Sequence, residues 1–333
     1  MSKKILIITD NIPEQINGVV TTYKNIEPYA LRDGYTIDYI HPGRYRYIDL
    51  PFYNEVKVAI PRDMGQEIQK IRPDYIHIAT EGPIGVFARR HLAVSGLRYN
   101  TAYHTKFPEA LKKMLHIPEF ITWPLIRWFH AKSNKVLTTT PSMVKQLRSK
   151  GFGDNVVPWT RGVDRDQFFP LQYRSERKVP VLLCVSRVSE EKNLEEFYEM
   201  DFGECVKVQV GDGTMLETHK KKYPDVQFVG AKRGAGLVRH YQEADVFVFP
   251  SRWDTFGIVM IEAMACGTPV AAYPTQGPVD VIEQGVTGYM DEDLVTATKQ
   301  ALTLDRNAVY NNSTNWSWEE AWHIFRDNLV KIV

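Results

Sequence analysis

The stretch that most constrains the fold covers residues 245–273. Residues 245–249 (DVFVF) form an almost continuous apolar run, which is typical of a strand buried on both faces of a parallel sheet. A helical pattern follows over 258–265, Gly267 suits the position just past a helix, and 269–273 has the composition of another strand. A strand–helix–strand unit of this kind predicts a parallel sheet, in which ligands bind beyond the carboxyl ends of the strands.

Two acidic residues lie in this unit. Asp254 is in the loop after the first strand, and Glu262 lies inside the helix among isoleucine, methionine and alanine residues. A carboxylate in such apolar surroundings is costly unless a partner binds it. A structural interpretation makes Asp254 a helix cap and pairs Glu262 with an arginine, whereas a functional interpretation has both acids bind a ligand.

The amino-acid sequence around these two acids favours the functional interpretation. Residues 250–270 (PSRWDTFGIVMIEAMACGTPV) closely resemble the donor-binding segment of the retaining glycosyltransferases of family 4, which have the two-domain GT-B fold. That family usually shows an acid-x-F-G motif, then E-A, then G-x-P-V. The first acid is more often glutamate, so this chain resembles the branch with a D-T-F-G form. The matching residues are Asp254-Thr255-Phe256-Gly257, Glu262-Ala263 and Gly267-Thr268-Pro269-Val270.

The resemblance also assigns roles to these residues. It implies that Glu262 holds the ribose hydroxyl groups of a nucleotide-sugar donor. It further implies that Asp254 holds the hexose, together with the backbone of Phe256, Gly257 and Ile258.

The implied fold consists of two Rossmann-like, doubly wound α/β domains that face an interdomain cleft. We expect the first domain at residues 1–171, the donor domain at 172–314, and an amphipathic helix within 315–333 that crosses back to the first domain. Apolar runs alternate with helical patterns along the chain, as such a fold requires. Strands are expected at 4–8, 36–40, 56–59, 74–78, 98–103, 136–139, 180–185, 206–210, 226–229, 245–249 and 269–273.

Two residues of the first domain are candidates for the site. Gly18 opens a helical pattern after the loop that follows the first strand, where glycine lets the backbone approach a diphosphate, although any tight turn also favours glycine. His104 follows the strand at 98–103, and from position alone it could equally hydrogen-bond a loop. The resemblance to the family's loop histidine implies that His104 contacts the donor sugar and shapes the reaction centre.

Two cations follow the strand at 180–185 in the second domain. Arg187 and Lys192 in one short loop suit a diphosphate, while a solvated loop with unrelated charges is the structural alternative. The family's R-x-x-x-x-K segment neutralises the nucleotide diphosphate, which implies that role for both residues. Gly230 ends the strand at 226–229, where the resemblance places the nucleotide base. The Gly211-Asp212-Gly213 turn is a weak nucleotide signal by itself.

We expect neither a metal ion nor another cofactor. Asp291-Glu292-Asp293 superficially resembles the metal-binding DxD motif of the other glycosyltransferase fold. It follows a turn at the start of a helical pattern, so we interpret it as an N-cap with an acidic first turn. No side chain suggests itself as a covalent nucleophile, in agreement with the front-face mechanism that the resemblance implies.

Residues 112–135 (KKMLHIPEFITWPLIRWFHAKSNK) mix aromatic with basic side chains. Such a composition suits a helix that lies on an anionic membrane surface. Two core-packed helices with solvated lysines are the structural alternative, and nucleic-acid binding through the same patch is a third interpretation. The residues concerned are Phe120, Trp123, Leu125, Trp128 and Phe129, with Lys112, Lys113, Arg127, Lys132 and Lys135.

Composition excludes several classes of protein. A net charge of +1 over 333 residues argues against a dedicated nucleic-acid binder. The three cysteines, Cys184, Cys205 and Cys266, are scattered, which indicates buried thiols in a reducing cytoplasm. No apolar run reaches the roughly 18 residues of a membrane span, and the amino terminus shows no signal-like segment. We therefore expect a cytoplasmic protein, peripheral at the inner face of the membrane if residues 112–135 bind lipid.

The sequence thus predicts a retaining hexosyltransferase. It would move a hexose from a UDP- or GDP-linked donor to a hydroxyl acceptor such as a lipid, a polysaccharide or a small molecule. A GT-B-like epimerase or phosphorylase would share the fold but needs other catalytic groups. A non-catalytic subunit that binds sugar nucleotides would have lost Arg187, Lys192 or Glu262, all of which are present.

Overall fold

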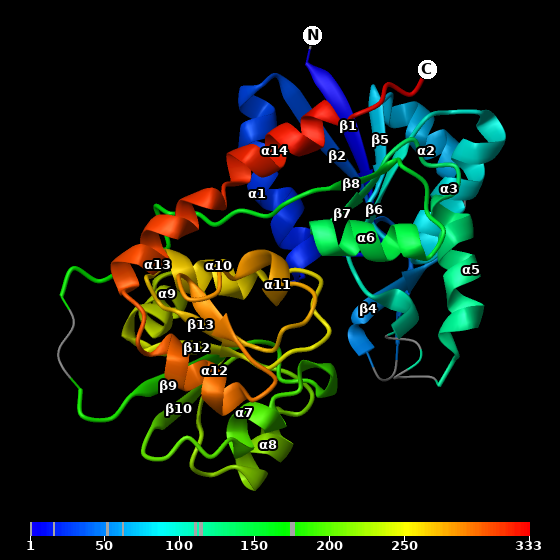
Figure 1. Cartoon of the computed structure of the whole chain (residues 1–333). Coiled ribbons are helices and arrows are strands. Elements are labelled where there is room, and N and C mark those ends of the chain that lie inside the picture. The colour runs from blue at the N-terminus through cyan, green and yellow to red at the C-terminus, as the bar shows by residue number, and fades with distance from the viewer. Residues whose placement is uncertain are drawn as a thin grey trace. The chain divides into compact units, whose positions relative to one another are not determined.

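Each of two units of the chain is built on its own parallel β-sheet (Figure 1). Unit 1 comprises Met1–Arg161 and Trp318–Val333, and unit 2 comprises Gly162–Ser317. The computed structural model describes residues 2–15, 17–50, 53–61, 63–109, 112, 116–173 and 177–333, with the backbone alone at 49–50 and 53–57. The two parallel-sheet α/β units confirm the predicted fold class.

Unit 1 contains a six-stranded sheet in the order β2-β1-β5-β6-β7-β8, with neighbouring strands parallel throughout. Its strands are short apolar runs, such as the KKILII of β1, whose last four residues are buried. The strands are β1 (Lys3–Ile8), β2 (Tyr35–Ile40), β5 (Tyr75–Ile78), β6 (Asn100–Tyr103), β7 (Val136–Thr138) and β8 (Val156–Pro158). The helices are α1 (Gly18–Arg32), η1 (Pro42–Arg44), α2 (Met64–Ile71), α3 (Pro83–Ser95), α5 (Glu119–His130), α6 (Pro141–Ser149) and α14 (Trp318–Asp327).

Helices cover both faces of this sheet. Leu6 of β1 belongs to a buried cluster that includes Ile84 of α3. Ile5, the preceding residue, points to the opposite face because side chains alternate along a strand. On that face α1 and α14 pack together, and the rings of Tyr23 and Phe325 lie 6.2 Å apart. Burial on both faces explains why the strands are continuous apolar runs.

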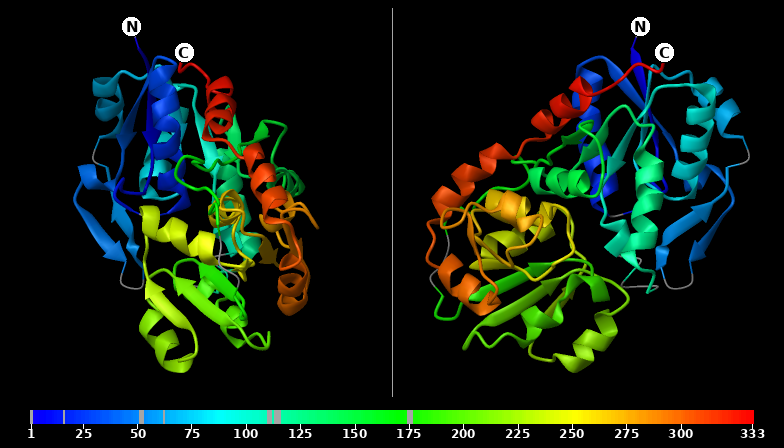
Figure 2. Two further views of the ribbon diagram at one scale, coloured as in Figure 1. Left: turned by 90° about the vertical axis from the view of Figure 1, so that its left-hand side faces the viewer. Right: turned by 45° about the vertical axis from the view of Figure 1, so that its right-hand side comes forward.

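One predicted strand of unit 1 lies outside the six-stranded sheet. The strand expected at 56–59 is part of β4 (Tyr53–Ala59), which pairs antiparallel with β3 (Tyr47–Leu50) in a separate hairpin (Figure 2). Its sequence, YNEVKVA, alternates polar and apolar residues. Alternation is typical of an antiparallel strand with one solvated face, so assigning it to the buried parallel sheet was wrong.

Unit 2 contains a second six-stranded parallel sheet, in the order β11-β10-β9-β12-β13-β14. The strands are β9 (Val181–Val185), β10 (Val206–Val210), β11 (Gln227–Gly230), β12 (Val246–Phe249), β13 (Val270–Ala272) and β14 (Gly288–Met290). The helices are η2 (Glu190–Lys192), α7 (Glu195–Glu199), α8 (Leu216–Lys222), α9 (Gly234–Glu243), α10 (Ile258–Ala265), α11 (Pro278–Val281), α12 (Leu294–Ala301), α13 (Arg306–Asn312) and η3 (Ser313–Asn315).

This second sheet is also buried on both faces. Leu183 of β9 packs in a cluster with Met260 of α10, whereas the preceding Leu182 packs in another cluster with Phe197 of α7. The short strand β14 was not among the predicted strands. Its Gly288 lies so close to β13 that an added Cβ atom would be 2.2 Å from the carbonyl oxygen of Val270. A three-residue strand that begins with glycine carries too little hydrophobic pattern to be recognised from sequence.

The boundary between the units differs from the expected one. Phe168 packs on the ring of Tyr241 with their centroids 6.0 Å apart, and Gln242 donates to the carbonyl oxygen of Phe169 over 2.7 Å. These contacts place residues 162–170 in unit 2 rather than in the first domain. At the other end, Trp316 still packs edge-on against Phe256 of unit 2, so the tail joins unit 1 only from Trp318 onward.

The tail docks on unit 1 through α14. The indole nitrogen of Trp159 donates to the carbonyl oxygen of Ala321 over 2.8 Å, and that of Trp322 donates to Asp33 over 2.8 Å. Arg326 forms an ion pair with the same Asp33 over 2.9 Å. Beyond the helix, the amide of Ile332 donates to the carbonyl oxygen of Asp74, the residue before β5, over 3.1 Å. The carboxyl end of the chain is therefore an integral part of unit 1.

Replacing Trp322 by alanine is expected to lower the free energy of unfolding by about 3–5 kcal/mol, because the side chain is fully buried and leaves a large cavity. Urea unfolding of the full chain measures this change. Glu320→Ala on the same helix is the control, because that side chain is 59% exposed and its loss should change the free energy by less than about 0.5 kcal/mol. Equal effects of the two substitutions would contradict the docking of α14.

Region 112–135 is only partly packed. Lys113 lies outside the described residues, and Lys112 forms an ion pair with Glu119 over 3.0 Å. One face of α5 is buried and carries Trp123, Ile126 and Phe129. The opposite face is exposed and carries Phe120, Ile121, Leu125 and Trp128. The core-packed interpretation therefore accounts for one face of the helix only. Within the described residues, the helices are all too short or too polar to span a bilayer.

Candidate active site

The candidate residues of unit 2 surround the point where the strand order of its sheet reverses. The chain runs outward from β9 to β10 and β11, and then returns to place β12 on the other side of β9. In open α/β sheets, the loops that leave the carboxyl ends of the strands on either side of such a point form the ligand site. The loop after β9 carries Arg187 and Lys192, and the loop after β12 carries Asp254.

An ion pair joins these two loops. The Lys192 ammonium lies 2.7 Å and 3.0 Å from the two carboxylate oxygens of Asp254. Burial alone would raise the pKa of Asp254, but the charge and hydrogen bonds of Lys192 outweigh it and hold this pKa below its usual value. Asp254 does not cap α10, because Gly257 occupies the N-cap position with a φ of 84°. Asp254 is therefore not the helix cap of the structural interpretation, and its partner within unit 2 is Lys192.

Arg187 also has a carboxylate partner. Its guanidinium lies 3.1 Å from Glu191, and the hydroxyl group of Ser189 donates to the same carboxylate over 2.7 Å. The two cations predicted to meet a diphosphate are thus both neutralised within unit 2. An incoming anion would compete with these carboxylates, a feature that sequence analysis did not predict.

The loop that carries Arg187 rests against the glycine turn after β10. The amide of Ser186 donates to the carbonyl oxygen of Val210 over 3.1 Å. Gly211 has a φ of 141°, and a Cβ atom there would lie 1.8 Å from the carbonyl oxygen of Ser186. The Gly211-Asp212-Gly213 turn, a weak signal in the sequence, therefore supports the cationic loop by close backbone approach.

Glu262 lies on α10, the helix that follows Asp254. Its carboxylate accepts a hydrogen bond from the hydroxyl group of Tyr241 over 2.8 Å. Burial raises the pKa of Glu262 to about 7, although this hydrogen bond acts in the opposite direction. The predicted structural partner was an arginine, but the bond goes to a buried tyrosine. A carboxyl group whose pKa is strongly raised by its surroundings is typical of a functional site.

Backbone groups complete this half of the site. Gly257 gives α10 no side-chain cap, so the first turn of that helix can donate amide hydrogens to a ligand. Phe256 is buried against Trp316, which fixes the loop before the helix. Gly230 ends β11 with a φ of 72°, and an added Cβ atom there would meet nothing within 4 Å. A ligand can therefore approach the backbone at Gly230 closely.

In unit 1 the strand order reverses between β1 and β5, and the loop after β1 leads to Gly18. Gly18 is the first residue of α1, as predicted from the sequence. The side chain of Asn17, however, accepts hydrogen bonds from the amides of Val19 and Val20 over 3.1 Å and 3.0 Å. Asn17 thus already uses two of the amides at the start of α1, next to the glycine that was expected to approach a diphosphate.

His104 follows β6 and is buried. Its Nδ1 atom lies 2.9 Å from the Arg161 guanidinium, and its Nε2 atom lies 3.2 Å from the Tyr23 hydroxyl. Burial, together with the nearby charge of Arg161, keeps the pKa of His104 well below its usual value. The ring is therefore neutral, and both of its nitrogens have partners within unit 1. Arg161 was not among the residues predicted to belong to the site.

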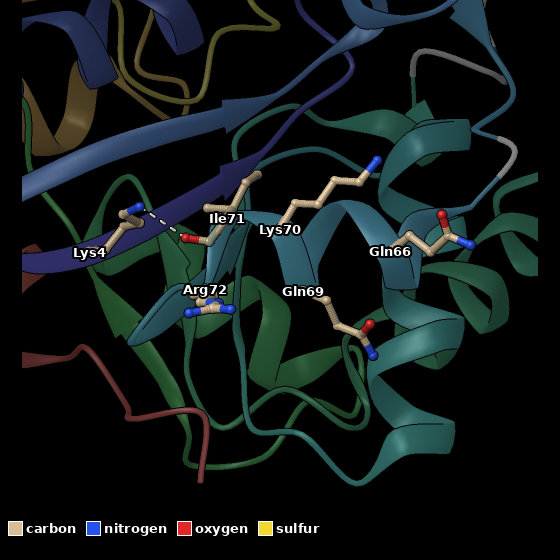
Figure 3. A pocket seen from close by; sticks show the side chains of 6 residues that line it. All are labelled: Lys4, Gln66, Gln69, Lys70, Ile71 and Arg72. Carbon is tan, nitrogen blue, oxygen red and sulfur yellow. Dashed lines mark hydrogen bonds between the residues drawn. The ribbon is translucent and has the colours of Figure 1, made fainter.

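A surface hollow of roughly 590 Å³ also lies in unit 1 (Figure 3). It is lined by Lys4, Gln66, Gln69, Lys70, Ile71 and Arg72. Lys4 lies at the start of β1 and the other residues lie along α2 and at its C-cap, so the hollow is at the edge of the sheet opposite to the ligand edge. Lys4 donates to the carbonyl oxygen of Ile71 over 2.9 Å, as the dashed line in Figure 3 marks. We do not assign this hollow to the site.

The acidic run at 291–293 provides the predicted N-cap, but Asp291 and Glu292 precede α12, so the predicted acidic first turn was wrong. Asp293 is the N-cap of α12 and accepts from the amides of Val295 and Thr296. Asp291 accepts from the amide of Asp293 over 2.8 Å, and Glu292 lies 3.4 Å from Arg252.

Comparison with known proteins gives two family matches that together cover most of the chain. The Glycosyltransferase Family 4 description matches residues 16–167, and the description "Glycosyl transferases group 1" matches residues 166–306. The sulfoquinovosyl transferase SQD2 of Arabidopsis thaliana is 29% identical over 286 residues, which cover 76% of this chain. The match spans only about half of that relative, 54% of its length.

Two further proteins extend this similarity. A GDP-mannose-dependent alpha-mannosyltransferase of Corynebacterium glutamicum is 24% identical over 319 residues, covering 86% of this chain and 76% of that protein. The solved structure of sucrose-phosphate synthase from Thermosynechococcus elongatus superimposes with a TM-score of 0.80 at 18% identity, covering 98% of both chains. The structural likeness supports the GT-B fold, and the family matches with the transferase relatives show that this chain is a glycosyltransferase that belongs to family 4.

Proposed function

We propose that this glycosyltransferase is retaining and moves a hexose from a UDP- or GDP-linked donor to a hydroxyl acceptor. The observation that carries the proposal is the Lys192–Asp254 pair at the point where the strand order reverses, with Glu262 on the adjoining helix. In this pair, Lys192 would bind the diphosphate of the donor, and the adjacent Asp254 carboxylate would accept from hydroxyl groups of the sugar. Glu262 would accept from the ribose hydroxyl groups, and the backbone at Gly230 would contact the base.

The proposed transfer breaks the bond between C1 of the hexose and the diphosphate oxygen. The acceptor oxygen attacks the same face of C1, and its proton passes to the leaving diphosphate. Negative charge grows on the diphosphate while the sugar acquires oxocarbenium character, and fixed cations stabilise this separation. Arg187 and Lys192 would provide that stabilisation without a metal ion. His104 would contact the donor sugar as a neutral ring, because Arg161 and Tyr23 occupy its two nitrogens.

Incubation of the full chain with single nucleotide sugars tests this function. We expect release of UDP or GDP from one of UDP-glucose, UDP-galactose and GDP-mannose, with water as a slow acceptor, and the same rate in the presence of EDTA. Retention predicts that the sugar freed from an α-linked donor is the α-anomer at early times, which proton NMR detects. Initial release of the β-anomer would refute retention, and activity restored only by added magnesium or manganese would refute metal independence.

The same experiment separates the alternatives. An epimerase would change the hexose while it remains linked to the nucleotide, and a phosphorylase would need inorganic phosphate. A non-catalytic subunit would bind a nucleotide sugar without releasing nucleoside diphosphate.

We also propose that the exposed face of α5 docks on an anionic membrane surface, which would place the enzyme at the inner face of the membrane. Phe120 is 77% exposed and Leu125 is 53% exposed, and Trp128 lies on the same face. The exposed cations Arg127 and Lys132 accompany them. Large apolar side chains next to cations complement the acyl and anionic headgroup regions of a bilayer.

Sedimentation with vesicles tests this docking. The Phe120→Ser/Leu125→Ser variant is expected to bind vesicles containing phosphatidylglycerol at least about tenfold more weakly than the wild type, because each exposed side chain contributes about 1.5–3 kcal/mol when buried in lipid. Tyr173→Ser is the matched control, since that ring is 84% exposed elsewhere in the chain. Equal sedimentation of all three proteins would refute the docking, as would retention on single-stranded DNA instead of vesicles.

A further inference from the structure

Four polar side chains form a buried chain of hydrogen bonds in unit 1. They come from four separate segments: Arg161 follows β8, His104 follows β6, Tyr23 lies on α1 and His77 lies on β5. Their exposed fractions are 3%, 8%, 3% and 0%, in that order. The Tyr23 hydroxyl lies 2.8 Å from Nε2 of His77 and 3.2 Å from Nε2 of His104. The Arg161 guanidinium lies 2.9 Å from Nδ1 of His104.

The chemistry of arginine sets the direction of every bond in this chain. A guanidinium can only donate, so Nδ1 of His104 must accept and carry no proton. The neutral imidazole then carries its proton on Nε2, which donates to the Tyr23 hydroxyl oxygen. Tyr23 has one hydroxyl proton, and it goes to Nε2 of His77. The remaining His77 proton is on Nδ1, which has no hydrogen-bond partner.

We propose that Arg161 is a positioning residue of the active site, which holds His104 as the neutral tautomer protonated on Nε2 and fixes the orientation of its ring. The tautomer follows from the contacts in unit 1 alone. The consequence for donor binding rests on the proposed function, in which His104 contacts the donor sugar.

The burial of Arg161 supports this role. A guanidinium removed from water is costly unless it is well paired. Arg161 donates to neutral acceptors, namely the carbonyl oxygens of Trp159 and Thr160 over 2.7 Å and 3.0 Å and the ring of His104. Its guanidinium carbon also lies 4.7 Å from the centroid of the Trp159 ring. An apolar side chain in this place would deprive the two carbonyl oxygens and Nδ1 of His104 of this donor, and the His104 ring is the side-chain acceptor that Arg161 holds in place.

Arg161 also prevents His104 from acting as an acid or a base. A protonated ring would present an N–H group to a guanidinium that already donates at 2.9 Å. In the part of the chain that the structure describes, the charge of His104 is influenced by Arg161, Tyr23, His77 and His130 of α5. None of these four is a carboxylate that would stabilise an imidazolium, and the Glu81 carboxylate lies 3.3 Å from His130. The side chain should therefore serve the sugar as a fixed surface rather than as a proton carrier.

Nitrogen NMR of the full chain labelled with ¹⁵N-histidine tests the tautomer without any assay of activity. The His104 signal is assigned by its loss in His104→Gln. In the wild type we expect an unprotonated Nδ1 and a protonated Nε2, both unchanged between about pH 5 and 8, where ordinary histidines titrate. A proton on Nδ1, or titration of His104 in this range, would overturn the proposal before any substitution at Arg161 is made.

Substitutions then identify the responsible residue. Arg161→Met should give a mixture of tautomers or a titrating ring, whereas Arg161→Gln keeps an N–H donor and should preserve the tautomer. Tyr23→Phe is the matched control, because it removes the partner of Nε2 and leaves Arg161 in place. An unchanged tautomer in Arg161→Met would overturn the proposal. If Arg161→Met fails to fold, the Arg161→Gln and wild-type spectra decide.

Activity is measured separately. If the proposed function is correct, Arg161→Met should lower kcat/KM by about 10- to 100-fold, as expected from a small displacement of a group that positions substrate, and Arg161→Gln should recover most of the loss. If Arg161→Met changes the tautomer but not the turnover, the proposal that Arg161 positions His104 stands, and the proposed contact between His104 and the donor sugar is refuted. No turnover in any protein, with the expected wild-type spectrum, would refute the proposed function alone.

Discussion

Replacing Lys192 by alanine is expected to lower kcat at saturating donor by about 100- to 1,000-fold, the usual effect of removing one fixed group that stabilises transition-state charge. Charge on the diphosphate is greater in the transition state than in the bound donor, so the loss should appear in kcat and not only in KM. The substitution also leaves Asp254 without the ammonium that lies 2.7 Å away. An unpaired carboxylate there would repel the leaving group and add to the loss.

Two controls accompany this measurement. Lys220→Ala removes a lysine from an exposed ion pair with Glu217 and should leave turnover unchanged. Lys192→Arg keeps a cation and should recover part of the activity, although its planar geometry differs. A Lys192→Ala enzyme with normal kcat and a raised KM would show that the lysine binds donor equally in ground and transition states, and the assigned role in charge stabilisation would be wrong.

The fold follows from short-range pattern at most positions. The apolar runs of β1, β9 and β12 were recognisable because burial on both faces demands continuous hydrophobic residues. The same criterion failed for β4, where alternation in YNEVKVA should have indicated a separate antiparallel pair. It also failed for β14, whose glycine at position 288 is required by close contact with the neighbouring strand rather than by any periodic pattern.

The candidate site was also predictable only in part, because the location of its residues could be inferred from the sequence but their contacts could not. Arg187, Lys192 and Asp254 were located because each follows the carboxyl end of a predicted strand, where parallel sheets bind ligands, and because the resemblance assigned them roles. Their partners were not. Lys192 and Asp254 are 62 positions apart in the sequence, and Glu262 and Tyr241 are 21 apart. Such pairs leave no local signature, because they depend on how strands are ordered and helices packed.

The buried chain through His104 shows the same limit more strongly. Tyr23 lies 81 positions away from His104 and Arg161 lies 57 away. Neither residue looks unusual in its own segment, since a tyrosine on an amphipathic helix and an arginine before a glycine are both ordinary. Only the folded sheet brings them to one histidine. A role for His104 could be inferred from resemblance, but its protonation state required the structure.

Donor affinity is expected to increase with pH through about pH 7, because Glu262 must be ionised to accept from two ribose hydroxyl groups. Burial raises the pKa of this carboxyl group to about 7, so a substantial part of the free enzyme is protonated at neutral pH. Below that pKa a proton has to be released on binding, so the dissociation constant should rise by about tenfold for each unit by which the pH falls. Calorimetric titration with the cognate donor between about pH 5.5 and 8.5 measures this slope.

Substitutions at the two partners should change this profile in different ways. Glu262→Gln cannot ionise, so its affinity should be weak and independent of pH, and it is the matched control for loss of charge at constant size. In the wild type the Tyr241 hydroxyl group donates to Glu262 over 2.8 Å, and this hydrogen bond lowers the pKa of the carboxyl group. Tyr241→Phe removes the hydrogen bond. Its profile should therefore shift to higher pH. A wild type whose donor affinity is as flat as that of Glu262→Gln would contradict the assignment of Glu262 to the ribose.

The ionisation of Glu262 also predicts that the stability of the free protein decreases with pH, whereas donor affinity increases. The pKa of Glu262 is raised on folding from 4.5 to about 7, so the folded protein binds this proton more tightly than the unfolded chain does. Its contribution to stability is complete below about pH 4.5 and is lost as pH rises through about 7. Glu262→Gln should remove this dependence from urea unfolding between those values. Donor should then stabilise the wild type most where the free protein is least stabilised by protonation, at and above pH 7. A donor effect on unfolding that is equal at pH 5.5 and 8 would mean that ribose binding does not involve the ionised carboxylate.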